Sequence, residues 1–259
     1  MFGPQNHLTL NKNNISRLVA GLSINKIKWV RSLRDKKTRD ELGLFVVEGE
    51  KIVREVLENH PYLIDVVFAL EGELEEFPQI QRINEKELER ISNLNTPNKA
   101  LAVVRKPENT PINKGLFLVL DTIQDPGNLG TILRLADWFN VKAVICSIET
   151  ADCFGPKAVQ AAMGSILRVA VQYSDLKDWF EQNTLPVYGA KLDGQNIYCE
   201  SLEENAVLII GNEGKGISAD LLKYISHSLT IPKFGHAESL NASVATGIIL
   251  SEFKRRQFI

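Results

Sequence analysis

Short runs of apolar residues alternate along the chain with stretches in which apolar residues recur at helical spacing. The runs at 116–120 and 206–210 are entirely apolar, which is typical of strands buried on both faces of a parallel sheet. Further strands are expected at 43–47, 64–70, 100–104, 141–146, 169–171, 186–190 and 229–231. Helical patterns separate these strands, so the sequence predicts an α/β fold whose C-terminal part is built on a parallel sheet.

Two prolines with polar neighbours interrupt this pattern at 106–111 and indicate a boundary between two domains. We therefore expect a flexible N-terminal arm at 1–20, a small α/β domain at 21–106, a linker at 107–114 and a second α/β domain at 115–259.

Polar and glycine-rich segments follow the strands of the second domain. We expect a loop at 121–130 before a helix at 131–139, and a second loop at 211–216 before a helical segment at 221–226. A third loop leads into a helix that begins Ser239-Leu240-Asn241. The unpaired amides and short polar side chains of such a helix start can bind a polar ligand, although an ordinary capped helix gives the same pattern.

The composition bounds the class of protein. The chain has 259 residues, 44% of them hydrophobic, and no apolar run near the roughly 20 residues that a membrane helix needs. It also lacks a signal-peptide pattern, so we expect a cytoplasmic protein. Cys146, Cys153 and Cys199 form no C-x-x-C motif and have no neighbouring histidines, so we expect small buried hydrophobic residues and neither a metal site nor a disulfide framework.

The formal net charge of −2 argues against indiscriminate nucleic-acid binding, but one segment is strongly basic. Between residues 26 and 39 only Asp35 opposes seven basic residues: Lys26, Lys28, Arg31, Arg34, Lys36, Lys37 and Arg39. Such a cluster is suited to RNA phosphates. A solvated helix face would show the same charges.

The loop Gly211-Asn212-Glu213-Gly214-Lys215-Gly216 follows a strand, as nucleotide-binding loops do. Its glycine spacing differs from the G-x-G-x-x-G fingerprint, and no G-K-[ST] follows. Taken alone, it is weak evidence for any cofactor.

Three stretches taken together are more specific. They are 125–132 with Arg134, 210–217, and Ile231-Pro232 with 238–245. In this order and spacing they resemble the three signature motifs of the SpoU (TrmH) family of RNA 2'-O-ribose methyltransferases, over about residues 115–256. The domain at 21–106 is similar to that family's ribosomal-protein-like RNA-binding domain. The resemblance implies a deep C-terminal trefoil knot, a homodimer and S-adenosylmethionine as the cofactor.

The resemblance also assigns residues to the cofactor. Gly211, Ile231 and Leu240 match the contact positions, and the residues expected close by are Asn212, Glu213, Gly214, Gly216 and Ser239. Glycine permits close approach of the backbone to adenine, and the two aliphatic side chains offer apolar walls. Core packing is the alternative for Ile231 and Leu240.

The catalytic residues implied by the resemblance are Arg134, Asn128, Ser239 and Asn241. A ribose hydroxyl is a poor nucleophile, so the site must remove its proton or stabilise the developing alkoxide. A guanidinium is effectively never deprotonated, which favours charge stabilisation and phosphate binding for Arg134, with a surface arginine as the alternative. Asn128 is expected to shape its loop or contact the ribose, and Ser239 and Asn241 to orient the hydroxyl. His236 is expected to face solvent.

Three functions are weighed against these sequence features. The first is methylation of a ribose 2'-hydroxyl in ribosomal or transfer RNA. The second is RNA binding without catalysis, which the complete set of polar motif residues disfavours. The third, a nicotinamide-dependent oxidoreductase, lacks its glycine fingerprint and its ribose-binding acid. The sequence identifies neither the RNA nor the nucleotide.

Overall fold

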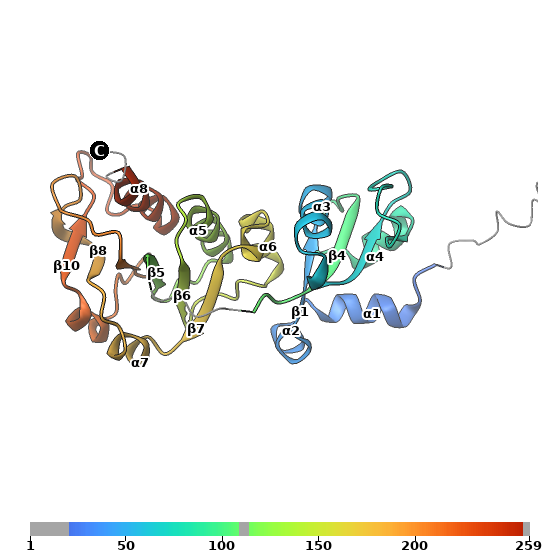
Figure 1. The fold of residues 1–259 in the computed structure, drawn as a ribbon, viewed down its shortest axis with the longest axis horizontal. Coiled ribbons are helices and arrows are strands. Elements are labelled where there is room, and N and C mark those ends of the chain that lie inside the picture. Colours follow the sequence, from blue (N-terminus) through green and yellow to red (C-terminus); the bar gives the residue numbers. More distant parts are fainter. Residues whose placement is uncertain (1–20, 109–113, 256–259) are drawn as a thin grey trace, which may run out of the picture.

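The computed structural model describes residues 21–108 and 114–255 and contains two separate sheets, one in each of two units that lie side by side (Figure 1). A four-stranded sheet has the order β1-β4-β2-β3, and a six-stranded sheet has the order β10-β8-β9-β5-β6-β7. The predicted arm and the middle of the predicted linker lie outside the described residues. The expected α/β class with a C-terminal parallel sheet is confirmed.

The N-terminal unit is a small mixed sheet covered by helices. Its strands are β1 (Leu44–Glu48), β2 (Ile64–Ala69), β3 (Gln81–Arg82) and β4 (Ala100–Arg105), and β4 runs antiparallel to both β1 and β2. Its helices are α1 (Ile24–Ser32), α2 (Lys36–Leu42), α3 (Glu50–Asn59) and α4 (Glu85–Ile91), with a 3-10 turn at Pro61–Leu63. Strand β3 has only two residues and was not predictable from the apolar pattern.

The C-terminal unit has six strands, and every pair is parallel. They are β5 (Leu116–Leu120), β6 (Ala143–Ser147), β7 (Ala170–Ser174), β8 (Val187–Asn196), β9 (Ala206–Ile210) and β10 (His227–Thr230). The chain runs from β5 outward to β7 and then builds β8, β9 and β10 on the other side of β5. In open parallel sheets the carboxyl ends of the strands at such a reversal form the usual ligand site.

Helices cover both faces of this sheet (Figure 1). Leu116, Leu118 and Leu120 pack with α5 (Pro126–Trp138), α6 (Pro156–Ala162) and α8 (Ala242–Arg255). Phe117 and Val119 face α7 (Leu176–Glu181) and the 3-10 segment Ala219–Tyr224. A further 3-10 turn spans Ser165–Leu167. Alternate residues of β5 are thus buried on opposite faces, which explains its uninterrupted apolar sequence.

The predicted starts of two α-helices were wrong, and the strand predicted at 186–190 continues to Asn196. Helix α5 begins at Pro126 rather than 131, because the Asp125 side chain accepts a hydrogen bond from the Asn128 backbone at 2.9 Å and proline suits the first helical turn. Gly130 then lies inside the helix, where a Cβ would stand 2.4 Å from the Ala158 carbonyl oxygen of α6. Gly130 therefore serves the packing of α5 on α6 and is not part of a loop. Helix α8 begins at Ala242, and not at Ser239.

Candidate functional site

The loops that follow β5 and β9 are tied together at the carboxyl edge of the sheet. Asp121, 3% exposed, accepts hydrogen bonds from the Ser218 backbone at 2.6 Å and the Ser218 hydroxyl at 3.0 Å. The Asn212 amide donates to the Thr122 carbonyl at 2.9 Å. A buried carboxylate with several donors is a stable anchor, so the switch-point loops are fixed before any ligand binds.

The loop that contains Gly211 folds back on itself. The Asn212 and Gly216 backbones exchange two hydrogen bonds of 3.0 and 2.9 Å, and the Asn212 side chain accepts from the Gly214 and Lys215 amides. A Cβ at Gly211 would lie 2.3 Å from the Gly216 carbonyl carbon. Glycine is therefore required at 211 by the loop's own backbone, which is a different reason from the approach to adenine that the sequence analysis gave.

Three predicted site residues from three distant segments form one hydrogen-bond network. The Asn128 amide donates to Glu213 Oε1 at 2.8 Å. The Asn241 amide donates to Asn128 Oδ1 at 3.0 Å. The network brings together the start of α5, the loop after β9 and the start of α8, which are the segments that carry the three motifs.

Asn241 also caps helix α8. Its Oδ1 accepts the Ser243 amide at 2.9 Å, the Ser243 hydroxyl at 2.6 Å and the Val244 amide at 3.3 Å. Part of the polar helix start expected from the sequence is thus occupied by its own cap. Ser239 precedes the helix and is exposed.

Asp125 caps α5 and pairs with a lysine. The Lys157 ammonium donates to its carboxylate at 2.6 Å. This hydrogen bond, together with that from the Asn128 amide, lowers the pKa of Asp125 below its ordinary value. The carboxylate is therefore ionised at neutral pH and keeps the first turn of α5, which carries Asn128, in place.

Arg134 lies farther along α5 and is exposed. Six residues separate it from Asn128, which corresponds to about 9 Å along the helix and about 120° around it. Among the described residues, no hydrogen bond or ion pair involves its guanidinium. The structure therefore does not bring Arg134 into the network of Asn128, Asn241 and Glu213.

The two predicted apolar contacts differ in exposure. Ile231 follows β10, is half-buried and packs on the main core, whereas the Leu240 side chain is 46% exposed beside the start of α8. An exposed leucine next to fixed polar loops suits the flat face of a nucleobase. His236, in the same loop, is exposed as expected.

A polar cavity that the sequence did not indicate opens beside these loops. Its volume is about 310 Å³, and it lies at the carboxyl ends of β5, β6 and β7, with a lining that includes Asp121, Ser147, Ser174 and Ser218. None of Gly211, Ile231 and Leu240 lines it. The sequence does contain a signal for this cavity, because polar residues directly follow several of the parallel strands.

The basic segment is only partly open to solvent. Lys28 and Arg31 are exposed on α1, and the Lys26 ammonium lies 4.0 Å from the centre of the Trp29 ring. Arg34 donates to Asn93 Oδ1 at 2.8 Å and to the Ser92 carbonyl at 2.5 Å. Lys36 and Lys37 are exposed and pair with Asp40 and Glu41 one helical turn later.

Arg39 is the exception, and its prediction as an RNA contact was wrong. The residue is 3% exposed, and its guanidinium donates to the Leu33 and Arg34 carbonyls, each at 2.7 Å, and to Asp152 of the C-terminal unit. Because the guanidinium is buried and its hydrogen bonds go to other protein groups, it does not face a phosphate. Position in a basic run does not reveal which charge faces inward.

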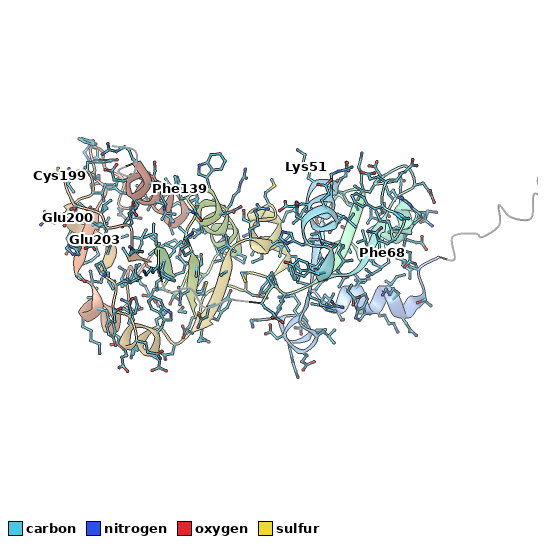
Figure 2. All side chains as sticks on the ribbon, viewed as in Figure 1. Lys51, Phe68, Phe139, Cys199, Glu200 and Glu203 are labelled. Carbon is cyan, nitrogen blue, oxygen red and sulfur yellow. The ribbon has the colours of Figure 1, made fainter. Side chains whose placement is uncertain are left out.

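The three cysteines also differ in burial. Cys146 and Cys153 are buried as expected, whereas Cys199 is exposed near the far end of the C-terminal unit (Figure 2). In the described parts of the chain, no cluster of three or more histidine, cysteine or acidic side chains is placed to hold a metal ion. No helix of residues 21–108 or 114–255 is long and apolar enough to cross a membrane.

Comparison with protein families matches both units. The model of the SpoU rRNA methylase family matches residues 115–251. That of the MRM3-like substrate binding domain matches residues 25–102.

Individual proteins match over nearly the whole chain. A Bacillus subtilis 23S rRNA (guanosine(2553)-2'-O)-methyltransferase is 33% identical, and the match covers 87% of this chain and 94% of that protein. The structure of a TrmH-family protein from Porphyromonas gingivalis is 40% identical with a TM-score of 0.82, covering 92% of this chain and all of the other. An AdoMet-bound rRNA methyltransferase from Sinorhizobium meliloti is 28% identical with a TM-score of 0.80, covering 90% and 96%. With its fold, its three linked motif segments and these matches, the chain belongs to the SpoU rRNA methylase family.

Proposed function

We propose that this protein is an S-adenosylmethionine-dependent methyltransferase that acts on the ribose 2'-hydroxyl of a nucleotide in 23S ribosomal RNA. The observation that carries the proposal is the network of Asn128, Asn241 and Glu213, which joins the three family motifs at the switch point of the sheet. Two similar proteins named for 23S ribosomal RNA, from Bacillus subtilis and Streptomyces viridochromogenes, match 87% and 89% of this chain, so both matches include the two units.

The cofactor would be held by the loops after β9 and β10. Gly211, Ile231 and Leu240 would contact it, with Asn212, Glu213, Gly214, Gly216 and Ser239 close by. The hydrogen-bonded loop at 211–216 and the exposed Leu240 side chain fit this role, because they offer a rigid polar backbone beside an apolar surface. When bound, S-adenosylmethionine supplies an electrophilic methyl group on its sulfonium.

The side chains around it would prepare the hydroxyl. Asn128 and Asn241 hold each other in fixed orientations, and Ser239 lies two positions before Asn241 in the chain, so these three would position the ribose. Arg134 would stabilise the negative charge that develops on the 2'-oxygen and hold an adjacent phosphate, because its guanidinium stays protonated.

A homodimer would bring Arg134 to the site. Arg134 is solvent-exposed and stands apart from the network of its own chain. Large apolar side chains are exposed on α5 and near the start of α8: Trp138 is 82% exposed, Val244 50% and Leu240 46%. These surfaces suit an interface between two copies, in which Arg134 of one subunit serves the cofactor of the other. The trefoil knot expected from the family resemblance stays a prediction.

The N-terminal unit would bind the RNA. Lys28 and Arg31 on α1 present charge to solvent beside the half-buried Lys26, and Lys36 and Lys37 add to it on α2. The relatives methylate different nucleotides, a guanosine in one case and a uridine in another. The identity of the nucleotide therefore does not transfer to this chain.

Mapping of 2'-O-methyl groups in total RNA tests the proposal. RNA from cells that lack the protein should lose methylation at one 23S position, and the wild-type chain should restore it, whereas Arg134→Ala should not. An unchanged methylation pattern would favour the alternative, an RNA-binding protein without catalytic activity. A lost methyl group in transfer RNA would confirm the reaction and correct the substrate.

A further inference from the structure

Arg39 connects the basic helix of the N-terminal unit to the C-terminal unit. Its Nη1 donates to the Leu33 and Arg34 carbonyls at the end of α1. Its Nε donates to Asp152 Oδ2 at 3.2 Å, and Nη2 donates to the same oxygen. The side chains of Arg39 and Asp152 are only 4% and 14% exposed. One buried guanidinium therefore fastens the carboxyl end of α1 to Asp152, which lies 113 positions after Arg39 in the chain.

The partner loop is built around Asp152. The other carboxylate oxygen, Oδ1, accepts the Phe154 amide at 3.0 Å, and the Asp152 carbonyl accepts the Gly155 amide at 3.1 Å. A Cβ at Gly155 would lie 3.1 Å from that carbonyl oxygen and 3.8 Å from the Arg39 guanidinium. The loop is thus held in the shape that presents Asp152 to Arg39.

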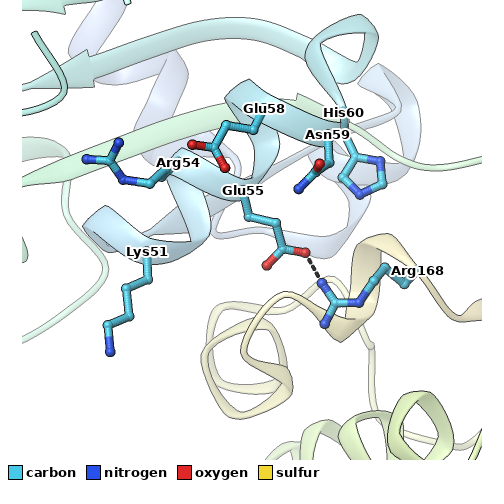
Figure 3. A pocket seen from close by; sticks show the side chains of 7 residues that line it. All are labelled: Lys51, Arg54, Glu55, Glu58, Asn59, His60 and Arg168. Atoms are coloured by element: carbon cyan, nitrogen blue, oxygen red, sulfur yellow. Dashed lines mark ion pairs between the residues drawn. The ribbon is translucent and has the colours of Figure 1, made fainter. Parts of the chain in front are cut away.

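Other contacts restrict rotation about this ion pair. The Phe45 ring of β1 packs on the Phe154 ring with centroids 4.9 Å apart. Glu55 of α3 forms an ion pair with Arg168 across a cavity of about 560 Å³ (Figure 3). Two domains joined by a linker move relative to each other by default, so a fixed arrangement needs contacts that hold them. Here a buried ion pair, an aromatic contact and a second ion pair lie at separate points of the junction.

The same loop leads into the helix pair that carries the proposed catalytic residues. Asp152 precedes α6, and α6 packs on α5 so closely that a Cβ at Gly130 would stand 2.6 Å from Ala161 Cβ. Helix α5 begins with the Asn128 network and carries Arg134. The contacts thus run without a break from the basic helix α1 through Arg39 and α6 to α5.

We propose that Arg39 is a positioning residue: with Asp152 it fixes the RNA-binding helix α1 relative to the methyl-transfer site on α5. This inference rests on the proposed function and deepens it. RNA bound along α1 is then held at a set distance and angle from the cofactor loops, so the target ribose reaches the site already aligned. A mobile domain would bind the RNA equally well but would present the ribose in many orientations.

Kinetics with two variants and a matched control test this role. Asp152→Asn removes the charge and leaves the carbonyl contacts of Arg39 intact, and Arg39→Gln removes both. Arg82→Gln is the control, because Arg82 also donates to backbone carbonyls, those of Leu70 and Leu74, but within its own unit. At saturating RNA and cofactor, the single-turnover rate should fall about 10- to 100-fold for the first two variants and stay near the parent rate for the third. Affinities for RNA and cofactor should not change.

Label distances separate positioning from misfolding. Cys199 is exposed and Cys146 and Cys153 are buried, so one spin label on Cys199 and a second on Glu89→Cys span the two units. In a homodimer, labels on the two chains also give distances to each other. A sample labelled on Cys199 alone measures this contribution between chains. The distance distribution should broaden in Asp152→Asn and Arg39→Gln and should match the parent in Arg82→Gln.

Two results would overturn the inference: a parent-like distance distribution in both variants, or a methylation rate that falls only with the fraction of folded protein. Failure of the proposed function gives a different pattern. In that case the parent itself methylates no 23S RNA, while the label distances still report whether Arg39 and Asp152 fix the two units.

Discussion

The side-chain amide of Asn241 donates to Asn128 Oδ1 at 3.0 Å and joins the first turns of α8 and α5, two helices whose capping regions lie 113 residues apart in the chain. Asn128 uses its own amide for Glu213, so both polar ends of this side chain are occupied. The site is therefore organised by hydrogen bonds among protein groups, and a substitution at either asparagine affects more than one segment.

Asn241 has two functions in this network, and two variants separate them. Asn241→Ala removes the helix cap and the bond to Asn128, so the free energy of unfolding should fall by about 1–2 kcal/mol. Asn241→Ser keeps an oxygen for the cap and should lose about 1 kcal/mol or less. Chemical denaturation of both proteins measures the difference. Equal losses would show that the cap contributes nothing.

Gly211 should not tolerate even a methyl group. A Cβ there would lie 2.3 Å from backbone, so Gly211→Ala should distort the loop and abolish S-adenosylmethionine binding. Gly235→Ala is the control, because a Cβ at that position meets nothing within 4 Å. Titration calorimetry of both folded variants is the measurement, and tight binding by Gly211→Ala would exclude this loop from the cofactor site.

Charge reversal on α1 should weaken RNA binding through counterion release. In the variant Lys28→Glu with Arg31→Glu, the slope of log affinity against log salt should become shallower by about 1 to 2. The variant Lys51→Glu with Lys86→Glu makes the same change in net charge elsewhere on the N-terminal unit. If both variants lose affinity equally, net charge rather than this surface determines RNA binding.

A shared site in the proposed homodimer predicts complementation. Arg134→Ala should bind cofactor and transfer no methyl group, and Gly211→Ala should keep its arginine and bind no cofactor. In a mixed dimer one site then carries both lesions and the other carries neither, so activity should return to about half per heterodimer. Inactive heterodimers of verified composition would show that each chain builds its site alone.

The three thiols should differ in reactivity. Burial raises the pKa of Cys153 to about 12 and also raises the pKa of Cys146, so neither forms thiolate in the folded protein at neutral or mildly basic pH. Only Cys199 should react quickly with a thiol reagent. The unfolded chain releases these protons near the ordinary thiol pKa of about 8.5, so the free energy of unfolding should fall as pH rises above that value. Mass spectrometry and denaturation at pH 8 and 10 test both statements.

The strands buried on both faces were predictable from the sequence alone. Residues 116–120 and 206–210 became β5 and β9 with the predicted boundaries, because a strand buried on both faces of a sheet is apolar at every position. The start of α5 was missed, because Pro126, Gly127 and Gly130 are also typical of loops. The decisive signal was Asp125 directly before a proline, a common helix start.

The motifs named the residues of the candidate site as a set, but the contacts among them were not predictable from the sequence. The motifs indicated Asn128, Glu213 and Asn241, whereas their mutual hydrogen bonds depend on how α5 and α8 pack. Arg39 shows the reverse case. Its charge suggested an exposed surface, and its burial follows from a partner, Asp152, that lies in another unit and cannot be found by local pattern. Sequence periodicity describes one element at a time, and these contacts join elements.

The position of β5 also bears on how the protein is made. β5 is the first strand of its sheet, yet it pairs with β9, whose residues follow some ninety positions later. During synthesis β5, β6 and β7 leave the ribosome first, and the apolar edge of β5 stays uncovered until β9 arrives. Asn241 emerges later still. A nascent chain can thus carry Asn128 and Arg134 on a formed helix and still have no complete site, so methyl-transfer competence would appear only after the segment that carries Asn241 is released.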